Sequence, residues 1–423
     1  MSKISVSEMM KAVHELKTTK GIRCTLLGIG PMSGNVIEES FNAAKKHDFP
    51  LMFIASRNQV DCKELGGGYV FNWDQHEFVA AIRDIAEKTG FEGLYYICRD
   101  HGGPWQRDDE RNGKLPPVEA MNRAKQSLTS DLLAGFDLLH IDPTKDPHVN
   151  GVVPMETVIG RTLELIEHVE GERVKKSLPA VAYEVGTEET NGGLTSQDSF
   201  SMFIELLVKK LREKGLPCPD FIVGQTGTLT RLTENIGCFN ASTALKLSME
   251  TEKYGIGLKE HNADYLPDHV LCMHPILGVA AANVAPEFGV AEMRAYLLLA
   301  DVELNLYKLG ILKEKSNFIQ VIREETVKCQ RWRKWMVGDI CGLCIEEVMR
   351  DEKLVDKITE TSGHYNFYLP SVNAEILRMF HNLESVGLKP QTILKGRIRE
   401  SVEKYVDCFN LKGLTSMILN DIH

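Results

Sequence analysis

Short apolar runs and longer amphipathic runs alternate along the first 310 residues of the chain. The apolar runs show little polar alternation, as in parallel strands that are buried on both faces. They predict strands at residues 22–27, 51–55, 94–98, 138–141, 180–183, 221–223, 256–259 and 278–282. The amphipathic runs predict helices at residues 35–46, 74–89, 117–133, 155–169, 197–214, 241–254 and from the last strand to about residue 309. Eight strand-then-helix units in about 290 residues predict an α/β fold, a (β/α)8 TIM barrel.

The flanking segments predict helices outside the barrel. Residues 1–21 carry mixed charges in an amphipathic pattern and predict an N-terminal helix, after which the barrel covers residues 22–310. Residues 311–423 are too few for a second barrel and predict a mostly helical C-terminal extension. Such an appendage makes self-association plausible, so we expect a homo-oligomer.

Composition excludes several classes of partner. The chain has 423 residues, 43% hydrophobic and 26% charged, as in ordinary globular proteins. Its net charge of −10 disfavours nucleic acid, which is bound by clustered cations. The densest basic stretch, residues 331–335, is explained as a solvated helix face. Because no apolar run approaches membrane-spanning length and the N-terminus lacks an apolar signal core, we expect a cytoplasmic protein without a membrane partner.

Three short motifs are too incomplete to assign a function. Cys341 and Cys344 have CxxC spacing, but no second pair follows, so a zinc or redox role is disfavoured. Gly28 and Gly30 follow the first strand, yet the full GxGxxG spacing fails, and a dinucleotide site is disfavoured. No Gly-Lys-Ser/Thr loop is present, which argues against a sugar kinase.

The third predicted strand ends in a polar stretch. We expect Arg99, Asp100 and His101, followed by two glycines and a proline, to stop the buried strand and turn the chain. In a barrel the carboxyl ends of all eight strands meet at one face, so polar residues there share a site. The residues gathered in this way are Asn58, Gln59, Asp100, His101, His140, Asp142, Glu184, Glu188, Gln225, Glu260, His261 and Asn283.

This set predicts a metal centre. Two histidines and a carboxylate with an open position suit a divalent Lewis acid, zinc first, with manganese or magnesium for oxygen-rich sets. The predicted ligands are His101 and His261, with Glu184 or Glu188, and Gln225 as a weaker oxygen donor.

The remaining residues predict catalysis and substrate binding. Asp100, beside a ligand, is the expected acid/base. Glu188 and Asp142 are further catalytic candidates, although a residue such as Asp142 before a proline more often has a local structural role. The predicted substrate-binding residues are Asn58, Gln59, Asp264 and Asn283. The amides after Asn283 lie where barrels commonly bind phosphate.

Several segments carry a resemblance to a known family. They are residues 55–60 (Ala-Ser-Arg-Asn-Gln-Val), 100–106 (Asp-His-Gly-Gly-Pro-Trp-Gln), 134–136, 140–142, 186–188, 192–193, Gln225 and 260–265 (Glu-His-Asn-Ala-Asp-Tyr). In this order, over residues 22–309, the chain resembles the GatZ/KbaZ family. That family is described as the non-catalytic subunit of class II tagatose-1,6-bisphosphate aldolase, and its members are sometimes labelled tagatose-6-phosphate kinase.

The resemblance implies a site related to that of class II aldolases. In those enzymes an Asp-His pair at the third strand supplies the acid/base and a metal ligand, and an Asn at the eighth supports phosphate. Asp100, His101 and Asn283 match this pattern. Gln225 stands where the aldolases carry a metal-binding histidine, which argues against full aldolase activity. Similar proteins are assigned ketose 4-epimerase activity on tagatose and fructose or their phosphates.

Two departures from the family bear on the substrate. The family's basic-aromatic stretch near the C-terminus is not evident, and residues 365–373 are its nearest equivalent. Glu184 stands where relatives are apolar. Two hypotheses result. The chain is a metal-dependent epimerase or aldolase-type lyase acting on a ketose or ketose phosphate, or it is a stabilising partner of a separate class II aldolase subunit.

Overall fold

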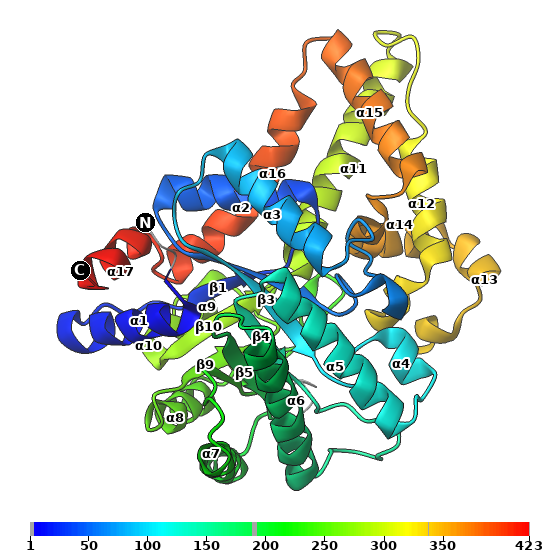
Figure 1. The fold of residues 1–423 in the computed structure, drawn as a ribbon. Coiled ribbons are helices and arrows are strands. Elements are labelled where there is room, and N and C mark those ends of the chain that lie inside the picture. The colour runs from blue at the N-terminus through cyan, green and yellow to red at the C-terminus, as the bar shows by residue number, and fades with distance from the viewer. Residues whose placement is uncertain (1–3, 188–192, 337, 423) are drawn as a thin grey trace.

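The computed structural model describes residues 4–187, 193–336 and 338–422. A closed parallel barrel forms its centre, and helices surround the barrel (Figure 1). The strands follow one another around the barrel in chain order, and the first pairs with the last. They are β1 (Leu26–Ile29), β2 (Leu51–Ser56), β3 (Tyr95–Gly102), β4 (Leu138–Ile141), β5 (Ala182–Gly186), β6 (Phe221–Val223), β9 (Gly257–Glu260) and β10 (Val279–Val284). The prediction of a (β/α)8 barrel is confirmed.

Helices follow the strands as the amphipathic pattern predicts. The outer ring consists of α2 (Gly34–His47), α3 (Gln75–Thr89), α5 (Pro117–Ala134), α6 (Met155–Lys175), α7 (Gln197–Glu213), α8 (Ala241–Glu252) and α11 (Pro286–Lys308). Local signals set several boundaries. Asp74 and Glu77 form a capping box at the start of α3, and proline occupies the first turn of α5 and α11.

Short elements lie in the loops. They are η1 (Lys63–Leu65), α4 (Asp108–Asn112), the antiparallel pair β7 (Thr230–Arg231) and β8 (Glu234–Asn235), α9 (Asp268–Leu271) and α10 (His274–Leu277).

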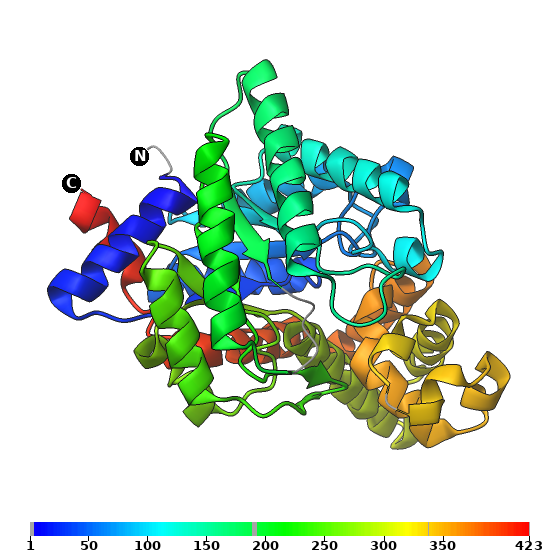
Figure 2. The ribbon, with the colours of Figure 1, turned by 90° about the horizontal axis from the view of Figure 1, so that it is seen from below.

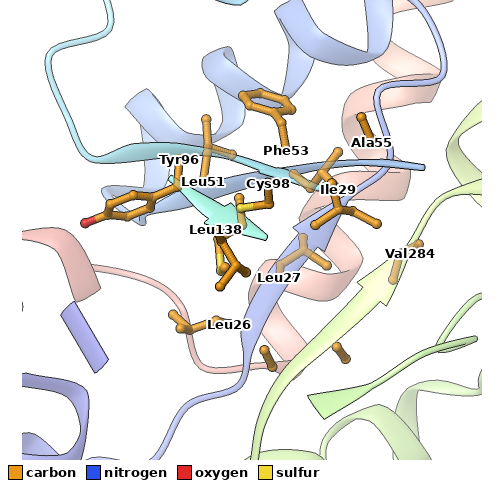
Figure 3. Close-up of a cluster of buried hydrophobic side chains, with 14 of the residues drawn as sticks. Leu26, Leu27, Ile29, Leu51, Phe53, Ala55, Tyr96, Cys98, Leu138 and Val284 are labelled. Atoms are coloured by element: carbon orange, nitrogen blue, oxygen red, sulfur yellow. The ribbon is translucent and has the colours of Figure 1, made fainter. Parts of the chain in front are cut away.

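The strands are apolar because side chains cover both of their faces. Figure 3 shows part of this core, in which Leu27, Phe53 and Val284 come from β1, β2 and β10. All three are completely buried. Burial on both faces explains why the strands read as continuous apolar runs.

Strand β3 is longer than predicted. It continues through Arg99 and His101 to Gly102, so the prediction that these residues end the strand is wrong. Arg99 remains completely buried because its guanidinium donates to both carboxylate oxygens of Asp131 on α5, at 2.8 and 2.5 Å. The register with β4 shifts between Arg99 and Gly102, and His101 has φ 48°, a left-handed conformation that is rare in a strand. This bulge brings the side chains of both Asp100 and His101 to the same cavity.

The C-terminal extension is helical, as predicted. It comprises α12 (Phe318–Cys329), η2 (Arg331–Lys334), η3 (Gly338–Gly342), α13 (Ile345–Met349), α14 (Glu352–Ser362), η4 (Gly363–Asn366), α15 (Pro370–Ser385), α16 (Pro390–Cys408) and α17 (Leu414–Ile422). Helix α16 packs against α2 and α11, and α17 packs against the N-terminal helix α1 (Val6–Lys20). Helices α12 to α14 lie at the end of the molecule opposite to both termini (Figures 1 and 2).

The basic stretch at residues 331–335 is only in part the solvated helix face that was predicted, because Lys334 is exposed but its neighbours are partly or completely buried. It forms the short 3-10 helix η2, in which Trp332 is completely buried and donates its indole N–H to the Val327 carbonyl. Among the described residues, no helix is both long enough and apolar enough to cross a membrane.

Candidate active site and metal centre

A cavity of about 340 Å³ lies at the carboxyl ends of the barrel strands. The predicted site residues that line it are Asn58, Gln59, Asp100, His101, Asp142, His261, Asp264 and Asn283. Glu184 and Gln225 are not in its lining, and Glu188 lies outside the described residues. The rule that strand ends converge therefore gathers most of the predicted set.

Four side chains can hold a metal ion, and three of them, Asp100, His101 and His261, line this cavity. Asp100, His101, His140 and His261 each offer one ligand atom, and these atoms lie within 4.8 Å of one another. They come from β3, from β4 and from the residue that follows β9. The sequence pattern places His140 at a strand end but does not predict it as a metal ligand.

Neighbouring carboxylates orient two of these imidazoles. His101 Nδ1 lies 2.5 Å from Asp142 Oδ2, and His261 Nε2 lies 2.8 Å from Glu184 Oε1. An ionised carboxylate accepts a hydrogen bond, so each of these nitrogens carries a proton and donates it. The opposite nitrogens, Nε2 of His101 and Nδ1 of His261, are 3.3 Å apart and point their lone pairs into the group.

This arrangement fits a divalent metal. Two nitrogens that bind one tetrahedral zinc ion at ~2.0–2.1 Å lie roughly 3.3–3.4 Å apart, close to the observed separation. The Asp100 carboxylate oxygens lie 3.7 Å from each inner nitrogen. His140 adds an imidazole whose Nδ1 is 3.7 Å from Asp100 and whose buried Nε2 has no hydrogen-bond partner among the described residues. Histidine nitrogen and carboxylate oxygen suit zinc.

Protons and a metal compete for the same place. Burial lowers the pKa of His101, but the charges of Asp100 and Asp142 outweigh it and raise the pKa above its ordinary value. Burial lowers the pKa of His261, and this effect prevails over the neighbouring carboxylates. A metal ion between the two inner nitrogens would take the place of any proton shared there.

The Asp100 carboxylate lies beside the inner nitrogens of both His101 and His261. Burial alone raises its pKa, but His101 and His261 outweigh burial and hold the pKa well below the usual range. Asn283 Nδ2 donates to Asp100 Oδ1 at 3.1 Å. Gly28 makes room for that amide, because a Cβ at Gly28 would lie 2.2 Å from Asn283 Oδ1. A close approach of β10 to β1 therefore explains the glycine that invited a dinucleotide interpretation.

Glu184 lies outside the cavity lining and contacts the metal-binding group through His261. Its Oε2 lies 2.5 Å from Lys259 Nζ, and both side chains are 1% exposed. Strand β6 separates β5 from β9, so this ion pair crosses the barrel interior. Burial raises the pKa of Glu184, but Lys259 first, then His140 and His261, lower it to about 2. The predicted ligand is thus positioned to support His261, and Lys259, a single charge in an apolar run, was missed.

Gln225 and Asp264 have local roles in the loops. The Gln225 backbone exchanges two hydrogen bonds with Thr195, which fixes the loop after β6. Asp264 Oδ1 accepts from the amides of Ala285 and Glu287 at the start of α11, at 3.0 and 2.9 Å. Burial raises the pKa of Asp264 to about 7 although these amides oppose it. The amides that were predicted to bind phosphate are therefore occupied by a side chain of the chain itself.

Asn58 and Gln59 line the cavity and also hold its walls. The Asn58 amide donates to the Gln106 carbonyl and accepts from the Asp108 amide, both at 3.1 Å. Gln59 Oε1 accepts from the backbone amide of Ser56 at 2.8 Å.

The C-terminal extension supplies one wall of the cavity. Lys334, Trp335 and Tyr365 belong to its lining, and the Trp335 indole donates to the Tyr365 hydroxyl at 2.8 Å. The Tyr365 ring packs edge-on against Tyr69, with ring centroids 4.6 Å apart. No local pattern in the sequence places residues 334–365 beside the strand ends, so this contribution was not predicted.

Comparisons with known proteins agree with the fold. A sequence model of the family described as D-tagatose-1,6-bisphosphate aldolase subunit GatZ/KbaZ-like matches residues 10–422. No curated protein matches the chain. A solved structure described as a probable tagatose 6 phosphate kinase from Sinorhizobium meliloti 1021 is 19% identical, with a TM-score of 0.73, over 91% of this chain and 100% of that one.

Two further solved structures share the fold at 12% identity. One is the fructose-bisphosphate aldolase of Campylobacter jejuni, with a TM-score of 0.54 over 97% of this chain and 96% of that one. The other is the fructuronate-tagaturonate epimerase UxaE of Cohnella laeviribosi, with a TM-score of 0.52 over 92% and 82%. At such low identity these likenesses establish the barrel fold.

Proposed function

The chain belongs to the D-tagatose-1,6-bisphosphate aldolase subunit GatZ/KbaZ-like family, and on that premise we propose that it is a metal-dependent carbohydrate enzyme. Its reaction is the epimerisation at C4 of a ketose or ketose phosphate of the tagatose/fructose type, by retro-aldol cleavage and re-addition. One observation carries the proposal. The inner nitrogens of His101 and His261 face each other at 3.3 Å beside the Asp100 carboxylate.

The residues divide into those that would hold the ion and those that move a proton. His101 and His261 would hold a divalent cation, zinc by preference, with a further ligand from His140 or from the substrate. Bound there, the cation supplies a Lewis acid that polarises the ketose carbonyl. Asp142 and Glu184 fix the orientation of the two imidazoles through their outer nitrogens.

Asp100 performs the proton transfer. Its carboxylate removes the C4 hydroxyl proton as the C3–C4 bond opens, which gives a three-carbon aldehyde and a three-carbon enediolate. The aldehyde turns its opposite face to the enediolate, the bond forms again, and Asp100 returns the proton to the new C4 alkoxide. The Asn283 amide, which donates to Asp100 Oδ1, keeps the carboxylate in place.

Metal content and activity together test this proposal. The wild type should bind one divalent ion per chain and interconvert the 4-epimers of a hexulose or hexulose 6-phosphate. His101→Ala should lose both properties. Asp100→Asn should keep the ion and lose epimerisation by ~10²–10⁴-fold. Epimerisation that persists unchanged after complete removal of the metal would refute the proposal.

The family description favours a second candidate, a stabilising subunit of a class II aldolase. Gln225, in place of a metal-binding histidine, also fits that role. In that case the purified chain would hold no metal after supplementation and would be inactive alone. It would raise the stability of a class II aldolase catalytic subunit when the two are mixed, with residues 311–423 as the candidate contact surface.

A further inference from the structure

The lining of the cavity includes a group of four cations. Arg111, Lys145, Arg231 and Lys334 line it, and Asp108 is the acid among them. Lys334 comes from η2 of the C-terminal extension, and Arg231 comes from β7 in the loop after β6. These cations contrast with a chain whose net charge is −10.

Two of these cations form no ion pair with a carboxylate among the described residues, although Asp108 lies close enough to Lys334 to influence it. Arg111 pairs with Asp108 at 2.7 Å. Within the described part of the chain, the Arg231 guanidinium donates only to the carbonyl of Thr230, at 2.9 Å. The ammonium of Lys334 lies over the rings of Trp335 and Tyr365, 5.0 and 5.6 Å from their centroids, and makes no hydrogen bond or ion pair within the described part of the chain.

The usual anion position of a barrel is closed in this protein. Barrels commonly hold a phosphate at the amides that follow the last strand. Here the Asp264 carboxylate occupies those amides at the start of α11. An anionic group on the substrate must therefore bind elsewhere in the cavity, and Arg231 and Lys334 offer the complementary charge there.

We propose that Arg231 and Lys334 form a subsite for the phosphate monoester of a ketose phosphate, so that the C-terminal extension completes the substrate site. This inference rests on the proposed function and narrows its substrate class to phosphorylated ketoses. A phosphate monoester carries nearly two negative charges at neutral pH, which two cations balance. Proteins commonly bind phosphate through an arginine guanidinium, which can donate two parallel hydrogen bonds, and through a lysine ammonium, which is a compact positive charge.

The electrostatics at Lys334 agree with an anion site. The Lys334 side chain is exposed, and desolvation together with the charges of Arg331, Lys145 and Arg111 lowers its pKa to about 8, although Asp108 opposes them. A crowded cation of this kind gains most when an anion arrives. A cavity of about 340 Å³ is within the size range of small-ligand sites.

Equilibrium binding tests the subsite without turnover. We would titrate the full-length, metal-supplemented protein with D-fructose 6-phosphate, D-fructose, inorganic phosphate and a keto-hexuronate in a calorimeter. The variants are Arg231→Gln and Lys334→Gln. The control is Lys328→Gln, an exposed lysine of α12 that pairs with surface glutamates and lies outside the cavity lining. Thermal melts confirm that each variant is folded.

The wild type should bind the phosphate ester at least 10-fold more tightly than the free ketose. Each substitution should weaken ester binding by ~10–100-fold, and the control should not change it. Equal affinity for ester and free ketose, or full ester affinity in both variants, would overturn the subsite. Tighter binding of the keto-hexuronate would overturn the phosphate assignment in favour of a carboxylate. Ester binding through these residues without epimerisation would overturn the proposed function alone.

Discussion

Replacement of Lys259 by methionine tests the ion pair that crosses the barrel. Methionine keeps most of the length of the side chain but removes the charge, so Glu184 is left as a buried carboxylate without its cation. The loss of one partner from a buried pair costs about 3–5 kcal/mol, because the remaining charge is uncompensated.

The pKa of Glu184 gives an independent magnitude. Burial raises it, yet Lys259, followed by His140 and His261, lowers it from 4.5 to about 2. That difference is the net effect of burial and all three cations, and it corresponds to about 3 kcal/mol. A chain of 423 residues has an unfolding entropy near 0.9 kcal/mol/K, from roughly 2.1 cal/mol/K per residue, so the loss should lower Tm by about 3–6 °C.

The same substitution should weaken the metal centre. Without Lys259, the Glu184 carboxyl takes up a proton more readily and becomes a poorer acceptor for the Nε2–H of His261. The inner Nδ1 of His261 is then less well oriented. Loss of such an outer partner typically costs ~10–100-fold in metal affinity.

The assay combines thermal unfolding of the metal-free protein with a zinc titration. Lys259→Met should show both losses, and the double variant Lys259→Met/Glu184→Gln should recover part of the stability, because an amide still accepts from His261 without a buried charge. The matched control is Lys253→Met, at an exposed surface pair. A Lys259→Met protein that melts within 1 °C (about 1 kcal/mol) of the wild type, or a double variant no better than the single one, would refute this account.

Three further predictions concern other parts of the site and the core. Gly28→Ala should displace Asn283, whose Oδ1 would lie 2.2 Å from the new Cβ, and should lower kcat at least 10-fold with metal content unchanged. Asp142→Asn should weaken zinc binding ~10–100-fold in a chelator competition, because the amide no longer accepts as a carboxylate from His101 Nδ1. Burial raises the pKa of Glu292 to about 7, above the 4.5 of the unfolded chain, so its stabilising proton is held in full below pH 4.5 and lost as the pH rises through 7. At pH 8 the Glu292→Gln protein should therefore unfold at a higher temperature than the wild type, with a free energy of unfolding greater by up to about 3 kcal/mol. At pH 4.5 the two proteins should unfold at the same temperature, and an equal shift at both pH values would contradict this.

The fold was predictable because its signal is repeated eight times. Strands at 138–141 and 221–223 match the structure at both ends. Strand β3 was cut short because Arg99 reads as a strand-ending charge, and its partner Asp131 lies 32 residues further along the chain. Only a tertiary contact makes a buried arginine acceptable there.

The site was predictable where it depends on strand ends, and not where it depends on which way a side chain points. Asp100, His101 and His261 follow from the convergence of the strands. The roles of His140 and Lys259 require the strand register, since alternate residues face the barrel interior and its outer surface. When both faces of a strand are apolar, the sequence pattern does not show which residues face the barrel interior and which face its outer surface.

The C-terminal extension is part of the candidate site as well as a cover for the barrel. Helix α16 returns to pack between α2 and α11, and the Lys404 ammonium pairs with Glu287 in the first turn of α11. Asp264 caps that same turn from the loop after β9. One end of the extension thus helps to close the anion position at the last strand, while η2 brings a cation to another wall of the cavity. A chain that kept its barrel but lost these helices would expose the apolar faces of α2 and α11 and lose Lys334. The extension therefore packs on the barrel helices through α16 and lines the cavity through η2, and the family match continues through it to residue 422.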